Sequence, residues 1–158
     1  MKTLDFTKLD ANASKNVANA LQELLADYQV LYTNLRGFHW NVKGKNFFVL
    51  HEQFENLYNN ASDKIDEIAE RILMLDGVPV HNFSEYLKTS RVKESGYVTD
   101  GDAGLKHVLE SYSHFIESER KILNLASEAG DESTVAMMSD YIKEQEKLVW
   151  MLVAYASN

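Results

Sequence analysis

Apolar residues recur at steps of three and four along almost the whole chain, and few helix-breaking residues interrupt them. In the first such segment the periodic positions are Val17, Leu21, Leu24, Tyr28, Leu31 and Leu35. This spacing places apolar side chains on one face of an α-helix. The chain has one proline and seven glycines, too few for the many turns of an all-β sandwich or barrel. The sequence therefore predicts an all-α protein.

The apolar runs divide the chain into four long helices and one short one. We expect helices near residues 13–42, 46–75, 83–90, 102–129 and 131–156. The connections are short except for residues 76–101, which hold the only proline and three glycines. Two short connections around a long one are typical of a ferritin-like four-helix bundle with a single crossover, and the short helix would lie in the long connection. At this length we expect one domain, residues 1–158.

Local signals mark several helix ends. Asp10 offers a side chain that can cap the start of the first long helix. Asp76-Gly77 is expected to end the second. Asn82-Phe83-Ser84-Glu85 resembles a capping box with asparagine as the cap, which predicts the short helix.

The composition excludes several classes of protein. Cysteine is absent, so disulfides, cysteine-based zinc sites, iron–sulfur clusters and thiol catalysis are excluded. The formal net charge is −8, from 24 acidic and 16 basic residues, and such a chain is not drawn to nucleic acid by its net field. No apolar stretch approaches the roughly 20 residues that span a membrane, and residues 1–14 lack the apolar segment of a signal peptide. We expect a cytoplasmic protein that does not engage membranes.

Histidine and carboxylate pairs on the second long helix are the best candidates for chemistry. The diiron motif found inside one bundle, Glu-x-x-His, is missing, because none of the five histidines has an acidic residue three positions before it. His51 and Glu55 are four residues apart and share a helix face, as do Asp66 and Glu70. Each pair offers nitrogen or oxygen ligands for Fe²⁺ or a similar divalent ion.

The two pairs cannot meet on one straight helix, because the chain rises about 22 Å between His51 and Asp66. An antiparallel copy of this helix, related by a two-fold axis across its middle, would bring one chain's acids to the other chain's histidine. His39 could reach the same place because the turn after it is short. The alternative is an ordinary solvated helix face with i,i+4 partners, which the spacing of Glu67 and Arg71 fits. Periodicity alone leaves both interpretations open.

Two nearby segments of the sequence give a more specific signal than helical periodicity does. They read FHWNVKGKNFFVLHE at residues 38–52 and DEIAER at residues 66–71. This constellation closely resembles the Dps family of miniferritins, and the predicted helix layout agrees with that family over nearly the whole chain. The resemblance implies a hollow homo-dodecamer, built from two-fold dimers, that oxidises Fe²⁺ with hydrogen peroxide or O₂ and stores the ferric product inside.

The resemblance also implies the ligands of a ferroxidase site across the two-fold interface. They are His39, His51 and Glu55 from one chain with Asp66 and Glu70 from its partner. The family often has aspartate where this chain has Glu55, and the longer arm leaves the second iron position open. Zinc could occupy the same ligands. Trp40 matches a tryptophan beside the site and is expected to help intercept radical oxidants; its alternative role is packing at the helix end.

Other acidic residues match further features of the family. Asp131 and Asp140 match acids that line the pores through which iron enters related shells, and Glu144 would extend such an acidic funnel. Asp131 is equally suited to stabilise the start of the last helix through the helix dipole. Glu52 and Glu55 resemble inward-facing acids proposed to nucleate mineral, with surface solvation as the alternative.

Four residues on the helix near 102–129 repeat at steps of three and four. They are His107, Glu110, His114 and Glu117. The family pattern assigns no ferroxidase ligand to this stripe, so we expect ordinary helix-surface residues. His81, in the long connection, receives no role.

Direct DNA binding, the other activity of the family, is expected to be weak or absent. Members that bind through a tail carry a lysine-rich terminus, whereas residues 1–15 here have a net charge of +1 and the last four residues hold no base. Phosphate-driven binding needs several positive contacts. Two alternatives to an iron store remain: a nucleoid protein that protects DNA by coating it, and a metal-free helical scaffold.

Overall fold

The computed structural model describes residues 1–157, which contain six α-helices and no β-strand. The helices are α1 (Leu4–Thr7), α2 (Ala11–Asn41), α3 (Phe47–Met74), α4 (Phe83–Thr89), α5 (Gly101–Glu128) and α6 (Glu132–Ala156). The all-α prediction is confirmed, and each predicted helix ends within two residues of its expected positions. The single turn α1 was not predicted, because it buries no residue and so leaves no apolar pattern.

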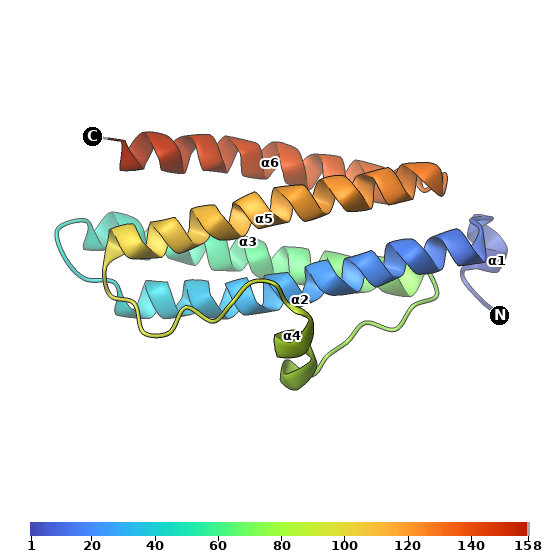
Figure 1. Ribbon diagram of the computed structural model, residues 1–158, viewed down its shortest axis with the longest axis horizontal. Helices are drawn as coiled ribbons and strands as arrows, with labels where there is room; N and C mark the ends of the chain where they lie inside the picture. Colours follow the sequence, from blue (N-terminus) through green and yellow to red (C-terminus); the bar gives the residue numbers. More distant parts are fainter. Residues whose placement is uncertain (158) are drawn as a thin grey trace.

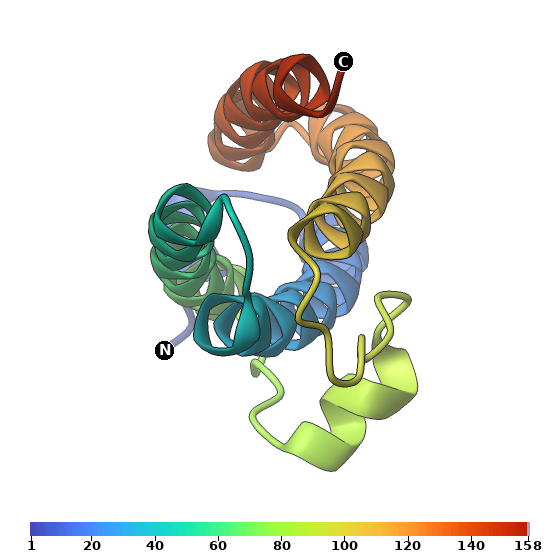
Figure 2. The same cartoon turned by 90° about the vertical axis from the view of Figure 1, so that its left-hand side faces the viewer.

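The four long helices form one bundle, with α2 beside α3 and α5 beside α6 (Figures 1 and 2). The long connection from α3 to α5 runs back along the outside of the bundle, and α4 packs against α2. Helix α5 therefore begins at the end of the bundle where α2 stops and α3 starts. There the backbone N–H of Lys43 donates to the carbonyl of Thr99 at 3.0 Å. This is the predicted ferritin-like bundle with a single crossover.

Aspartate side chains begin three of the long helices. Asp10, Asp100 and Asp131 each accept a hydrogen bond from a backbone N–H in the first turn that follows. Asp76, with a φ of 57°, takes the left-handed conformation that ends α3, and its carboxylate accepts from the backbone N–H groups of Thr3 and Leu4. The same residue therefore ends one helix and holds the start of another.

The predicted capping box before α4 is wrong in its mechanism. The helix starts at Phe83 as expected, but the Asn82 side chain makes no capping bond. Tertiary packing holds the helix instead. Tyr86 is buried against the bundle, and its hydroxyl donates to the carbonyl of Val80 at 2.8 Å.

The core of the bundle is filled by aromatic and branched side chains. The largest fully buried residues include Tyr28, Phe38, Phe54, Tyr112 and Phe115. Helix α5 can approach this core closely at Gly104, where a Cβ atom would lie only 2.9 Å from the ring of Phe54. No helix in residues 1–157 is both long and apolar enough to cross a membrane.

One polar cluster lies inside this apolar core. Glu119 is completely buried and accepts hydrogen bonds from the Tyr28 hydroxyl at 3.1 Å and the Gln145 amide at 2.6 Å. Burial raises the pKa of Glu119 to about 7, although the two hydrogen bonds act in the opposite direction. Its second oxygen, the Gln145 carbonyl oxygen and the Tyr112 hydroxyl have no hydrogen-bond partner among the described residues.

Candidate metal centre

His39 and His51 meet where the chain turns from α2 into α3. Val42 leaves the helix in an extended conformation and Gly44 has a φ of 106°, a backbone geometry that glycine adopts without strain. The short turn brings the two imidazole rings together, with ring centroids 3.8 Å apart and planes inclined by 20°. The expected proximity of His39 to His51 is confirmed.

The two histidines fix each other's ring orientation through the backbone. Nδ1 of His39 lies 2.8 Å from the carbonyl oxygen of His51, and Nδ1 of His51 lies 2.8 Å from the carbonyl oxygen of His39. A carbonyl only accepts, so both Nδ1 atoms carry the proton and donate it. In a neutral imidazole of this tautomer, Nε2 is the atom that carries the lone pair. A histidine whose Nδ1–H is held by a carbonyl is the usual form of an imidazole metal ligand.

Two aromatic side chains hold this histidine pair in place. The ring of Phe47 stacks on His51 at a centroid distance of 5.0 Å, and Tyr58 meets the ring of His39 edge-on at 5.4 Å. The hydroxyl of Tyr58 donates to Oε1 of Glu55 at 3.4 Å. Burial and the Glu55 carboxylate raise the pKa of this hydroxyl. The sequence analysis missed Tyr58 as a site residue, although it lies seven residues after His51 and so on the same helix face.

The acids Asp66 and Glu70 lie farther along α3 and are exposed. Asp66 lines an open surface hollow with Asp63 and Glu67, away from the histidine pair. Within residues 1–157, no three histidine or carboxylate groups come close enough together to hold a metal ion. One chain thus presents an incomplete ligand set at each of two places on α3.

Glu67 and Arg71, two neighbouring charged residues of α3, behave differently. The i,i+4 pair that their spacing fits does not form, because Glu67 binds a residue of α6 and Arg71 binds the residue that caps the start of α6. Glu67 accepts from the Tyr141 hydroxyl at 2.5 Å, and Arg71 binds Asp131 at 2.5 Å. Glu67 and Arg71 therefore stabilise the packing of α3 against α6, whereas Asp66 and Glu70 make no side-chain hydrogen bond or ion pair with the described residues.

The residues expected at an iron-entry pore differ in their surroundings. Asp131 is only 2% exposed, binds Arg71 and caps α6 through the backbone N–H of Thr134. Burial opposes its ionisation, but the bonds from Arg71 and Thr134 outweigh it and hold the pKa of Asp131 below its usual value. This geometry favours the helix-start alternative for Asp131. Asp140 is exposed. Glu144 is bound to Lys64 at 2.7 Å.

Trp40 follows His39 in the sequence and Glu52 follows His51. Both residues are exposed to solvent. The Trp40 side chain is 62% exposed, and the guanidinium of Arg36 lies over its indole ring at 4.6 Å. This exposure argues against packing within the chain as the role of Trp40. Glu52 is exposed on α3.

The prediction that His114 is an ordinary surface residue is wrong. Its Nε2 lies 2.7 Å from Oδ2 of the buried Asp27 on α2. The other oxygen of Asp27 accepts from the hydroxyl of Ser90 and from backbone N–H groups of Arg91 and Val92. The pair therefore fastens the long connection to the bundle. No sequence signal joins residues so far apart in the chain.

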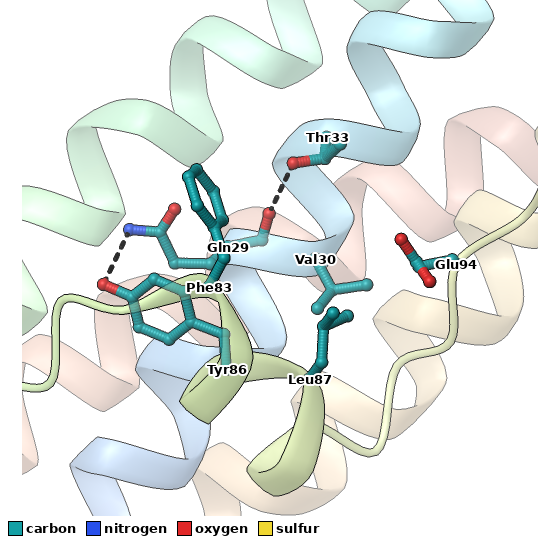
Figure 3. A pocket seen from close by; sticks show the side chains of 7 residues that line it. All are labelled: Gln29, Val30, Thr33, Phe83, Tyr86, Leu87 and Glu94. Atoms are coloured by element: carbon teal, nitrogen blue, oxygen red, sulfur yellow. Dashed lines mark hydrogen bonds between the residues drawn. The ribbon is translucent and has the colours of Figure 1, made fainter.

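A pocket between α2 and α4 lies apart from these ligand sets (Figure 3). Val30, Phe83 and Leu87 give it an apolar lining, and among the described residues Glu94 is the only carboxylate that lines it. One carboxylate does not make a metal site. The histidine pair therefore remains the better candidate for chemistry.

Comparison with known proteins agrees with this fold. Residues 18–158 match the Ferritin-like domain family. The chain is 50% identical over 156 residues to a Porphyromonas gingivalis protein named "DNA protection during starvation protein", covering 99% of this chain and 98% of that protein. Among solved structures it is similar to the DPS protein of Vibrio cholerae O1, described as a member of a superfamily of ferritin-like diiron-carboxylate proteins, with a TM-score of 0.93, 52% identity and 94% of each chain covered. A Dps protein from Bacillus brevis superposes with a TM-score of 0.90 at 35% identity, over 94% of this chain and all of that one. The chain belongs to the Dps family of ferritin-like proteins.

Proposed function

We propose that this protein is a ferroxidase and iron store, which oxidises Fe²⁺ with hydrogen peroxide, or with O₂, and keeps the ferric product in a hollow dodecamer. The observation that carries the proposal is the histidine pair, because both rings hold their Nδ1 protons on carbonyls and leave Nε2 free for metal. The similarity to ferritin-like diiron-carboxylate proteins supports iron as the metal.

The proposed site is shared between two chains. His39, His51 and Glu55 lie near the start of α3, and Asp66 and Glu70 lie about 22 Å farther along the same helix. A two-fold axis across the middle of α3 would place one chain's acids against the partner's histidines. Asp66 and Glu70 are exposed and so remain available to bind a metal ion with a partner chain, which supports this arrangement. The dodecamer would be built from such dimers.

The ligand set suits the oxidation of iron. Imidazole nitrogen and carboxylate oxygen bind Fe²⁺, and the negative charge of the carboxylates stabilises Fe³⁺ more than Fe²⁺. Few protein ligands leave coordination positions open for the oxidant. Two Fe²⁺ ions together supply the two electrons that hydrogen peroxide takes up when two protons convert it to two water molecules, so no hydroxyl radical needs to be released. Zn²⁺ would compete for the same ligands without oxidation.

Surface residues would support the movement of iron. Exposed Asp140 is proposed to line the route by which Fe²⁺ enters, and Glu52, with Glu55, to nucleate the ferric mineral. The carboxylate of Asp131 is bound by Arg71, so any contribution of Asp131 to a pore would be structural. Trp40, next in sequence to His39, is proposed to intercept oxidants that escape the site.

The test is a comparison of iron oxidation in matched histidine variants. Fe²⁺ and hydrogen peroxide are added to the purified protein while ferric absorbance and particle size are followed together. The double variant His39→Ala/His51→Ala should lose fast peroxide-driven oxidation and keep the size of the assembly. His81→Ala, which removes an exposed histidine of the long connection, is the control and should oxidise iron normally. Unchanged kinetics of iron oxidation in the double variant would contradict the assignment of the histidine pair to a ferroxidase site.

A second candidate function comes from the name of the Porphyromonas gingivalis relative, which refers to DNA protection. We propose that protection by this chain is indirect, through the removal of Fe²⁺ and peroxide. With a net charge of −8 and a near-neutral N-terminal segment, the chain should not retard DNA in a gel at neutral pH and physiological salt. A retarded band under those conditions would favour direct coating of DNA.

A further inference from the structure

Tyr58 contacts two of the proposed iron ligands of its own chain. Its ring meets the ring of His39 edge-on at a centroid distance of 5.4 Å, and its hydroxyl donates to Oε1 of Glu55 at 3.4 Å. Glu55 precedes Tyr58 by three residues on α3, and a long helical side chain leans back over the preceding turn. The helix geometry therefore brings the Tyr58 hydroxyl to the Glu55 carboxylate.

The ring of Tyr58 has a second aromatic neighbour besides His39. The ring of Tyr32, on α2, meets it edge-on with centroids 6.0 Å apart and planes inclined by 86°. Aromatic pairs favour such edge-to-face arrangements, so the two neighbours together restrict the orientation of the Tyr58 ring. The hydroxyl at the end of this ring is therefore a donor with a defined position.

Glu55 is a ligand that needs such a donor. Its carboxylate is exposed at the end of a flexible arm, and glutamate is among the side chains that lose most rotamer freedom when they are ordered. Within residues 1–157, the Tyr58 hydroxyl is the only group that donates a hydrogen bond to Glu55. A donor that already restricts the arm lowers the entropy lost when the carboxylate binds a metal ion.

We propose that Tyr58 is a positioning residue, which holds the Glu55 carboxylate in place for the second Fe²⁺ of the site; this inference rests on the proposed function. Tyr58 acts on the iron through Glu55 and does not bind it. Loss of a hydrogen-bond partner of a metal ligand typically weakens metal binding 10–100-fold. Because the bond is long and Glu55 is exposed, we expect an effect of about 10-fold on the second Fe²⁺. The first Fe²⁺ does not depend on Glu55 and should keep its affinity.

The experiment is a calorimetric titration of the assembled protein with Fe²⁺ in the absence of oxygen. The unmodified protein should bind two Fe²⁺ per site. Tyr58→Phe, which keeps the ring against His39, should keep the particle size and the first affinity and bind the second Fe²⁺ about 10-fold more weakly. Tyr97→Phe, which alters an exposed tyrosine of the long connection, is the matched control and should keep both affinities.

A second pair of variants tests whether Tyr58 acts through Glu55. Glu55→Asp shortens the arm by one methylene group and so removes a hydrogen bond that is already long. In the Glu55→Asp background, Tyr58→Phe should therefore leave the second affinity unchanged, because residues that act through one contact are not additive. A general structural role of Tyr58 would weaken binding equally in both backgrounds.

Three results would overturn the inference: an unchanged second affinity in Tyr58→Phe, an equal loss in both backgrounds, or a single Fe²⁺ per site in the unmodified protein. The same titration of His39→Ala/His51→Ala separates this failure from failure of the proposed function. If the unmodified protein binds Fe²⁺ and the histidine variant does not, the proposed site stands while the role of Tyr58 is rejected. If the two proteins bind Fe²⁺ alike, both proposals fall together.

Discussion

The molecule holds two groups of polar side chains that differ in how far their hydrogen-bonding capacity is used inside one chain. The histidine pair leaves both Nε2 atoms free, and Asp66 and Glu70 are exposed farther along the same helix. The interior group around Glu119 and the Arg71–Asp131 pair is held together by contacts between α2, α3, α5 and α6, although three of its buried polar atoms have no partner among the described residues. An open group is suited to an external ligand, whereas an interior group held together in this way maintains the fold. Changes to the interior group should therefore alter stability and leave iron oxidation intact.

The largest effect of this kind is expected for Arg71→Ala. It leaves the carboxylate of Asp131, 2% exposed, without its cation, and breaking such a pair costs about 3–5 kcal/mol of unfolding free energy. Denaturant unfolding measures the loss. Arg120→Ala is the matched control, because its ion pair with Glu146 is solvent-exposed and such pairs contribute less than about 1 kcal/mol. Equal losses in the two variants would contradict the assignment of Asp131 to the fold.

Glu119→Gln should remove a pH dependence of stability. The folded protein holds the Glu119 proton up to a pKa of about 7, whereas the unfolded chain releases it near 4.5. Stability from this group is thus complete below pH 4.5 and is lost as the pH rises towards 7, by about 3 kcal/mol in total. The variant should match the wild type near pH 4.5 and exceed it at pH 8 in urea unfolding. Glu128→Gln, on the surface of α5, should keep the wild-type profile.

The smallest effects separate two buried tyrosines of the interior group. Tyr28→Phe removes a hydroxyl that binds both Glu119 and Gln145, and should cost about 1–3 kcal/mol. Tyr112→Phe removes a buried hydroxyl that has no partner among the described residues, and should cost nothing measurable. Thermal or denaturant unfolding of the two variants compares them. A loss in Tyr112→Phe as large as that in Tyr28→Phe would show that the interior cluster is connected differently.

Periodicity was sufficient to predict the four long helices, because the apolar stripe of each is a local property of the sequence. It also placed His51 beside Glu55 on one helix face, since four residues make about one turn. The reciprocal bonds of His39 and His51 could not be predicted, because they depend on how closely two helix ends approach. The commitment of Asp131 to Arg71 and of His114 to Asp27 depends on helices that meet only in the folded bundle. Sequence spacing cannot say which of several acids will find such a partner.

The most direct test of the central claim, a metal site shared by two chains, is complementation between two inactive variants. One variant is His39→Ala/His51→Ala and the other is Asp66→Ala/Glu70→Ala, co-expressed with different tags and isolated as mixed assemblies. A mixed dimer contains one site with every ligand and one that keeps only Glu55, so peroxide-driven iron oxidation should return to about half of the wild-type rate per mixed dimer. Mixed assemblies no more active than either variant alone would contradict a shared site.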